Sequence, residues 1–264
     1  MLNDSQLRIL DASWWLDGRD AFADFQKAHI PGAIFFDLDK HSDQTSSLPH
    51  MMPEPATFSR MISDLGISAQ DQIVVYDTQG LFSAARVWWM FRTMGAKNVK
   101  VLDGGLPKWT AETRPIESGI HAIPPAPYFA AKLDVNAIAD LETVMASLTS
   151  ETQLLDARPA ARFKAETPEP RLGMRGGHMP GAHNLPYGQL LHADKTMKSA
   201  KELEAAFLAA GINLDKPIIN TCGSGVTAAV LTLALAVLNI PSRLYDGSWS
   251  EWGSRTDTPV HTGD

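Results

Sequence analysis

The sequence predicts an α/β protein made of two similar domains, each a parallel β-sheet flanked by helices on both faces. Three observations lead to this prediction. The chain has 264 residues, enough for two domains of about 100–150 residues. Short β-branched runs alternate with helical patterns along it. A set of sequence landmarks also occurs twice in the same order, which is the mark of an internal repeat.

The repeat consists of four pairs of segments at offsets of about 143–149 residues. The pairs are Ile9–Ala12 with Leu154–Ala157, His29–Ala33 with His178–Ala182, Ile73–Tyr76 with Pro217–Thr221, and Asp103–Gly105 with Asp246–Ser248. We therefore expect an N-terminal domain over residues 1–117 and a C-terminal domain over residues 134–264. Residues 118–133 are predicted to link them, because Pro124, Pro125 and Pro127 cannot continue a helix or a central strand.

Each copy contains a strand–helix–strand pattern. In the first copy we expect strands at 73–76 and 99–102 on either side of a helix at 84–94. In the second copy the strands are expected at 218–221 and 243–245, around a helix at 227–238. Strands connected in this way are joined by right-handed crossovers, so the sheets are predicted to be parallel.

Composition excludes several classes of function. Lys and Arg total 23 against 30 Asp and Glu, a formal charge of −7, so the chain has no basic excess for nucleic acid or acidic membranes. The longest apolar run, 226–238, is shorter than the roughly 20 residues of a membrane span, and residues 1–6 lack the pattern of a signal peptide. A monomer in the cytoplasm is expected. One cysteine excludes an internal disulfide and a cysteine-built zinc site; we expect neither metal nor cofactor.

The single cysteine, Cys222, follows the predicted strand 218–221 directly and is followed by Gly223-Ser224-Gly225-Val226-Thr227. This order puts the thiol at the carboxyl end of a parallel strand, where open α/β sheets keep their binding crevices. The glycines allow the backbone to curl so that several amides point inward, and the next helix adds its positive N-terminal end. Both effects favour a thiolate, the nucleophilic form of cysteine.

Two other cysteine chemistries fit less well. A cysteine-dependent phosphatase, or an arsenate reductase, needs an arginine six positions after the cysteine to hold the oxyanion, and that position is Ala228. A cysteine protease needs a histidine base, and none is close in sequence, although a distant one remains possible.

The residues of this loop resemble the active-site loop of the rhodanese superfamily of sulfurtransferases in its tandem form. The resemblance covers nearly the whole chain and is most specific at Cys222–Thr227. There it is similar to members that take sulfur from 3-mercaptopyruvate. Members that use thiosulfate carry basic residues at the second and third loop positions, whereas Gly223 and Ser224 are uncharged. Segments 35–39 and 162–171 also resemble the 3-mercaptopyruvate group.

The resemblance implies roles for individual residues. Arg162 and Arg171 are expected to hold the carboxylate and keto group of the donor, and guanidinium forks suit that task. The alternative is two solvated surface arginines. The loop residues Gly223, Gly225, Val226 and Thr227 are expected to line the same site.

The resemblance also implies that Asp39 and His50 polarise Ser224, forming a set that handles protons. A structural role for His50 is an open alternative.

The repeat predicts that only the second domain is catalytic. Asp77 stands where the second copy has Cys222, and an aspartate cannot carry sulfane sulfur. We interpret Asp77 as a structural carboxylate at a strand end. His29 and His178 belong to the repeated His-x-Pro-Gly-Ala turn and are interpreted as turn architecture. Most of the seven tryptophans are interpreted as packing residues, while the segment 248–250 is a candidate to line the site.

The expected activity is therefore transfer of sulfur from 3-mercaptopyruvate through a Cys222 persulfide, with release of pyruvate. The expected acceptors are cyanide, a small thiol or a thioredoxin-like protein. Two alternatives remain: a thiosulfate-using enzyme of the same fold, and a non-enzymatic rhodanese-like module that binds a partner protein.

Overall fold

The computed structural model describes residues 6–121 and 128–263, which divide into two compact units. The first unit holds the described parts of Met1–Thr45, Met52–Asp134 and Ala193–Thr196. The second holds those of Ser46–Met51, Val135–His192 and Met197–Asp264. Each sequence half thus contributes one short loop to the unit formed mainly by the other half. Residues 1–5, and residues 122–127 of the predicted linker, lie outside the described residues.

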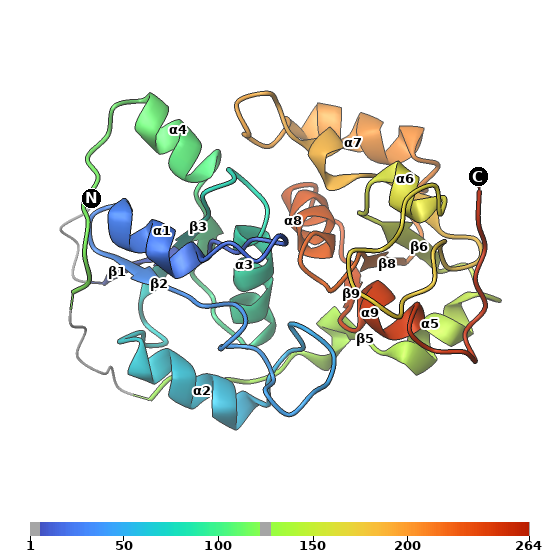
Figure 1. The fold of residues 1–264 in the computed structure, drawn as a ribbon, viewed down its shortest axis with the longest axis horizontal. Coiled ribbons are helices and arrows are strands. Elements are labelled where there is room, and N and C mark those ends of the chain that lie inside the picture. The colour runs from blue at the N-terminus through green and yellow to red at the C-terminus, as the bar shows by residue number, and fades with distance from the viewer. Residues whose placement is uncertain (1–5, 122–127, 264) are drawn as a thin grey trace. The chain divides into compact units, whose positions relative to one another are not determined.

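The first unit is a parallel sheet with strand order β2-β1-β3-β4 (Figure 1). Its elements are β1 (Leu7–Asp11), α1 (Ala21–Lys27), β2 (Ala33–Phe35), α2 (Pro55–Asp64), β3 (Gln72–Tyr76), α3 (Ala84–Thr93), β4 (Val99–Val101) and α4 (Gly105–Ala111). Phe25 of α1 and Leu106 of α4 pack in one apolar cluster with Ile9 of β1. On the other face, Phe58 of α2 and Phe91 of α3 meet edge to face, with ring centroids 5.3 Å apart.

The end of the predicted linker is part of this second cluster. Phe129 is 2% exposed and meets Phe58 and Phe91 with ring centroids 5.9 and 6.2 Å away. The amide of Lys132 also donates to the carbonyl of Met94. Residues 129–132 are therefore packed against the first unit.

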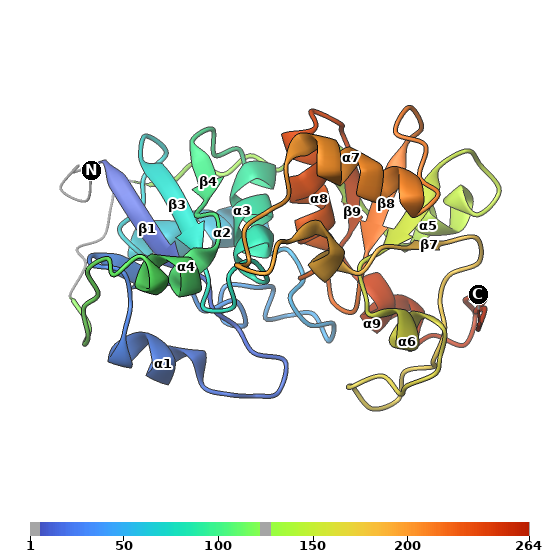
Figure 2. The same ribbon diagram turned by 90° about the horizontal axis from the view of Figure 1, so that it is seen from above.

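The second unit is a parallel sheet with order β5-β9-β8-β6-β7 (Figure 2). Its helices and strands are η1 (Val135–Ala137), β5 (Ile138–Ala139), α5 (Leu141–Ser147), β6 (Gln153–Asp156), α6 (Ala160–Phe163), β7 (His183–Asn184), η2 (Tyr187–Leu190), α7 (Ala200–Ala209), β8 (Ile218–Thr221), α8 (Ala228–Val237), β9 (Arg243–Tyr245) and α9 (Ser248–Trp252). Val144 of α5 and Trp249 of α9 share an apolar cluster with Ile219 of β8.

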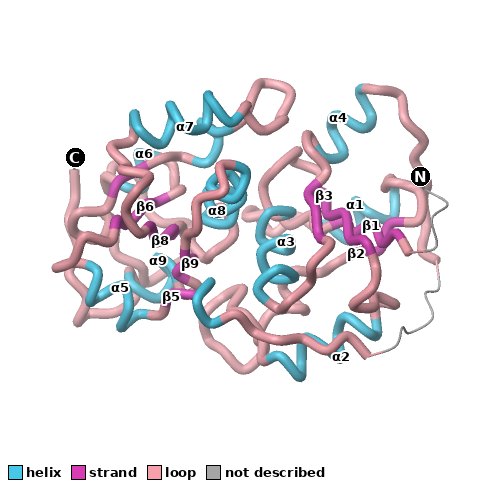
Figure 3. The backbone as a smooth tube through the Cα atoms, turned by 180° about the vertical axis from the view of Figure 1, so that it is seen from behind, coloured by secondary structure: helices cyan, strands magenta, loops and turns pink. Residues whose placement is uncertain are grey.

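The sequence explains which face of β8 each helix covers. Side chains alternate along a strand, so Ile219 and Asn220 point to opposite faces. Asn220 donates to Thr232 of α8 at 3.0 Å, whereas Ile219 packs with α9. The pattern of helix on both faces, visible in Figure 3, confirms the predicted architecture of each domain. The longest described helices have 10 residues, and none of them is long and apolar enough to span a bilayer.

The boundaries predicted for the strands and helices of the two strand–helix–strand patterns agree with the structure to within about one residue. The strands 218–221 and 243–245 are confirmed at both ends, and the helix 227–238 is α8 (Ala228–Val237). The strand expected at 99–102 ends at Val101, although the amide of Leu102 still donates to the carbonyl of Val75.

Candidate active site

The cysteine loop lies where β8 ends and α8 begins, at the carboxyl edge of the second sheet. Cys222 and Ser224 are buried, with 2% and 4% of their surface exposed, while Gly223 between them is half-buried. Gly225 has a φ of +75°, a left-handed conformation that glycine adopts without a steric penalty. The tight turn thus places the buried side chain of Cys222 next to Gly223, whose backbone is partly exposed to solvent.

Helix α9 holds the start of this loop by its backbone. The carbonyl of Cys222 accepts from the amide of Trp249 at 2.9 Å. The carbonyl of Gly223 accepts from the amide of Ser250 at 2.8 Å and from its hydroxyl at 2.7 Å. The amide of Cys222 donates to the hydroxyl of Ser248 at 3.3 Å. These contacts turn the two carbonyls away from the loop interior.

The amides of the loop are left for a ligand. Within the described ranges, 6–121 and 128–263, the backbone N–H groups of residues 223–227 donate to no protein acceptor. Buried N–H groups without an acceptor are rare, since each costs free energy comparable to a lost hydrogen bond. A row of such groups directly after a cysteine is suited to an anion, either a thiolate or the outer sulfur of a persulfide.

The first unit shows what the corresponding loop does with a carboxyl group. Asp77 takes the position of Cys222, at the end of β3. Its carboxylate accepts from the amides of Gln79, Phe82 and Ala84 at 2.8–2.9 Å. Burial raises the pKa of Asp77, and these amide bonds oppose the rise. The contacts agree with the interpretation of Asp77 as a structural carboxylate.

Both predicted arginines lie at the cysteine loop. A Cβ atom placed on Gly223 would be 3.2 Å from Nη2 of Arg162 and 4.0 Å from Nη1 of Arg171. Arg171 also reaches the hydroxyl of Ser224, with Nη2 3.4 Å from Oγ. The guanidinium groups therefore bring positive charge to the loop, where the uncharged Gly223 and Ser224 bring none.

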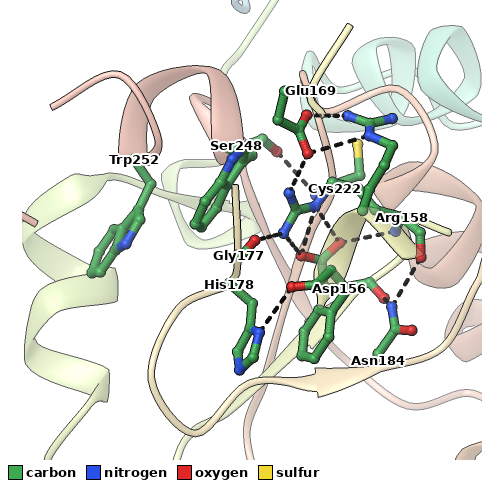
Figure 4. A network of polar contacts seen from close by, with 12 residues as sticks. Asp156, Arg158, Glu169, Gly177, His178, Asn184, Cys222, Ser248 and Trp252 are labelled. Carbon is green, nitrogen blue, oxygen red and sulfur yellow. Dashed lines mark hydrogen bonds and ion pairs between the residues drawn. The ribbon is translucent and has the colours of Figure 1, made fainter. Parts of the chain in front are cut away.

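Arg162 pairs with the end of a chain of alternating charges, and Figure 4 shows the buried members Asp156, Arg158 and Glu169 close to Cys222. Asp156, at the end of β6, accepts from Nη2 of Arg158 at 2.7 Å. Nη1 of Arg158 donates to Glu169 Oε1 at 2.8 Å. Glu169 in turn pairs with Nη2 of Arg162 through its other oxygen. Burial acts to lower the pKa of Arg158, but Asp156 and Glu169 more than offset it and the pKa is raised.

His50 lies in the segment 46–51, which belongs to the second unit, and there it contacts Ser224. Nδ1 of His50 is 3.0 Å from Oγ of Ser224, and His50 has a φ of +61°. Asp39 belongs to the first unit, where its carboxylate accepts from Nε1 of Trp14 at 3.1 Å. The contact between histidine and serine is present; a proton-handling role for the three residues stays a prediction.

The remaining predicted residues fall into two groups. Val226 is buried and Thr227 half-buried at the start of α8, and both belong to the row of amides described above. His29 and His178 each place Nδ1 within 3.0 Å of a carbonyl of the preceding helix, Phe25 and Phe163. Such contacts fix a turn, in agreement with their interpretation as architecture.

Sequence reasoning missed Arg158 and Glu169 as members of the site, and it did not give Ser248 a definite role. A signal for Ser248 was present in the repeat, where it replaces Gly105. The two residues have the same unusual backbone, with φ of +49° and +53°. A serine kept in a conformation that suits glycine indicates that its hydroxyl is needed. Among the described residues, no group of three or more His, Cys, Asp or Glu side chains is placed to hold a metal ion.

Comparisons with known proteins agree with this geometry. The model of the rhodanese-like domain matches residues 1–112 and 140–255. The chain is 45% identical to the 3-mercaptopyruvate sulfurtransferase of Escherichia coli K12, over 98% of this chain and 93% of the relative. It is 42% identical to the thiosulfate sulfurtransferase of Cricetulus griseus, over 93% and 84% of the two chains.

A solved structure has the same fold over nearly the same extent. The crystal structure of a 3-mercaptopyruvate sulfotransferase from Escherichia coli matches with a TM-score of 0.86 and 42% identity, covering 94% of each chain. The order of elements, the position of Cys222 and two matches to one family model lead to the same conclusion: the chain belongs to the rhodanese-like family and contains two rhodanese-like domains.

Proposed function

We propose that this chain is a sulfurtransferase that takes sulfur from 3-mercaptopyruvate and carries it as a persulfide on Cys222. The observation that carries the proposal is the row of loop amides, residues 223–227, which donate to no acceptor in the described parts of the chain. Those amides directly follow the sole cysteine in the chain, and two arginines lie against the same loop. The similarity to 3-mercaptopyruvate sulfurtransferases over nearly the full chain supports the choice of donor.

The first half-reaction moves one sulfur atom. The Cys222 thiolate attacks the sulfur of 3-mercaptopyruvate, a sulfur–sulfur bond forms, and the carbon–sulfur bond of the donor breaks. The electron pair of that bond leaves on the enolate of pyruvate, which then takes up a proton. Arg162 and Arg171 are proposed to bind the carboxylate and keto oxygen, where charge develops as the enolate forms.

Proton transfer in this step is assigned to Ser224 with His50. The 3.0 Å contact supports the assignment, since a serine hydroxyl bound to an imidazole can pass a proton to a neighbouring group. Asp39 is the third member of the predicted set. The persulfide then benefits from the buried site, because hydrogen bonds from the loop amides are stronger where water is excluded.

The second half-reaction returns the enzyme to its resting form. An acceptor, either cyanide or a thiolate, attacks the outer sulfur, the sulfur–sulfur bond breaks, and Cys222 leaves as a thiolate. We propose small thiols and a reduced thioredoxin-like protein as acceptors, a monomeric enzyme, and the cytoplasm as its compartment. A sole reactive thiol suits a reducing compartment.

Thiosulfate is the second candidate donor, because the relative from Cricetulus griseus is a thiosulfate sulfurtransferase. The uncharged loop positions favour the monoanionic keto acid over a dianion, and the positive charge instead comes from two arginines. Comparison of kcat/KM for the two donors decides between them, with 3-mercaptopyruvate expected to be preferred.

The test of the function is an intact-mass measurement after brief incubation with 3-mercaptopyruvate. Wild-type protein should gain one sulfur atom and lose it again on addition of cyanide. Cys222→Ser should gain none, and turnover by that variant would contradict the proposal. A non-enzymatic module predicts an inert thiol instead. We expect Cys222 of the wild-type protein to react with a small, uncharged alkylating reagent at pH 7.

A further inference from the structure

Glu169 lies between two arginines and is shielded from water. Its side chain is 1% exposed. Oε1 accepts from Nη1 of Arg158 at 2.8 Å and from Nε of Arg162 at 3.2 Å, and Oε2 accepts from Nη2 of Arg162. The carboxylate thus holds the guanidinium of Arg162 along one edge, by two of its three nitrogens.

Arg158 cannot release Glu169 easily, because its other nitrogens are also used. Nε and Nη2 donate to Asp156, Nη2 donates in addition to the carbonyl of Gly177 at 2.8 Å, and the guanidinium stacks 4.3 Å from the ring of Trp249. Trp249 is the residue whose amide holds the carbonyl of Cys222. The network therefore fixes Arg162 relative to the cysteine loop.

The charges of this network cancel. Asp156 and Glu169 contribute two negative charges, and Arg158 and Arg162 contribute two positive charges. Arg162 therefore presents hydrogen-bond donors to the loop with its charge already balanced.

We propose that Glu169 is a specificity-determining positioning residue that tunes the site for a monoanionic sulfur donor. It orients Arg162 through two hydrogen bonds and removes the surplus charge that would favour a dianion such as thiosulfate. This inference rests on the proposed function. It differs from that function in predicting that the choice of donor depends on a carboxylate that does not touch the loop.

Two substitutions separate charge from shape. Glu169→Gln keeps the shape and removes the charge, so the site gains one net positive charge, which acts twice as strongly on a dianion as on a monoanion. We expect the ratio of kcat/KM for thiosulfate to that for 3-mercaptopyruvate to rise by about tenfold. Glu169→Asp keeps the charge and shortens the side chain, so both donors should be used more slowly while the ratio stays within about twofold of wild type.

Glu166→Gln is the matched control, because it removes the same charge from an exposed position on the same loop. It should leave the ratio within about twofold of wild type, since exposed charges are screened. Both donors are measured on one preparation of each variant, so any loss of folded protein cancels in the ratio. An unchanged ratio for Glu169→Gln, or equal shifts for Glu169→Gln and Glu166→Gln, would overturn the inference and leave persulfide formation intact. Failure of wild-type protein to form the persulfide would instead overturn the proposed function.

Discussion

Gly223 is the residue at which the loop, the arginines and α9 meet. Its carbonyl accepts two hydrogen bonds from Ser250, and its missing side chain leaves room for Arg162. Any larger residue here would put a Cβ 3.2 Å from that guanidinium, tighter than most real Cβ contacts. A basic residue at this position would therefore compete with Arg162 for the same space. The glycine makes the arginine on α6 the source of charge at the loop.

His41, a half-buried histidine of the first unit, provides a test of how a single side chain makes the stability of the fold depend on pH. Burial lowers the pKa of His41, although Nδ1 lies 2.8 Å from the carbonyl of Asp37, a contact that raises it. The folded protein therefore binds fewer protons than the unfolded chain as the pH falls below the ordinary histidine pKa of about 6.5. The contribution of His41 to the free energy of unfolding should therefore be complete above that pH and decrease as the pH falls below it.

We expect His41→Gln to flatten this dependence. Urea unfolding of wild type and variant between pH 5 and 7 measures the slope of the free energy of unfolding against pH. The wild-type slope should be positive and steeper than that of His41→Gln. Equal slopes for wild type and His41→Gln would show that His41 titrates alike in both states.

At the scale of elements, α9 acts as the anchor of the cysteine loop, and Ser248 begins it. The hydroxyl donates to the carbonyl of Tyr245 at 2.8 Å and accepts from the amide of Cys222 at 3.3 Å. Its φ of +49° is costly for a residue with a Cβ, by about 1–2 kcal/mol. The first residue of α9 thus has a strained backbone, and in this position its hydroxyl accepts the hydrogen bond from the amide of Cys222.

This balance predicts an inverted order of stability. Ser248→Ala loses the hydrogen bonds and keeps the strain, whereas Ser248→Gly loses the hydrogen bonds and removes the strain. We expect the glycine variant to be more stable than the alanine variant by about 1 kcal/mol, although glycine is normally the less stable of the two in a helix. Urea unfolding measures the difference, and persulfide formation should be slower in both. An alanine variant as stable as the glycine variant would contradict a strained Ser248.

At the scale of the whole molecule, the sequence pattern predicted the positions of strands, helices and tight turns, which depend on neighbouring residues. The apolar strand 218–221 and the helix after its glycines are where the pattern placed them, because burial of β-branched residues and the turn of Gly225 are local requirements. The pairing of Arg158 with Glu169 could not be predicted, since the two residues are 11 positions apart and the segment between them joins the short helix α6 to an aperiodic loop. Residues 46–51 pack with the second unit although they lie in the first half of the sequence, and this also depends on tertiary contacts alone.

The two units differ in the residues that lie beside their corresponding loops. At the offset of 145 residues that relates Cys222 to Asp77, Arg158 and Arg162 correspond to Ser13 and Asp17. In the first unit Asp11 accepts from the amide of Ser13 at 2.9 Å, where its counterpart Asp156 binds an arginine. The first unit therefore has the nest of amides without the chain of charges beside it.

This difference predicts the behaviour of a transplanted thiol. Asp77→Cys in a Cys222→Ser background should place a cysteine among amides but beside no Arg162 counterpart. We expect it to gain no sulfur from 3-mercaptopyruvate by intact mass under conditions that fully load wild type, because Asp17 and not an arginine stands at the position that corresponds to Arg162. Asp77→Cys alone is the control: circular dichroism should show a folded protein that loads one sulfur, on Cys222. A second sulfur on that control, or one on the double variant, would mean that the amide nest alone selects and activates the donor.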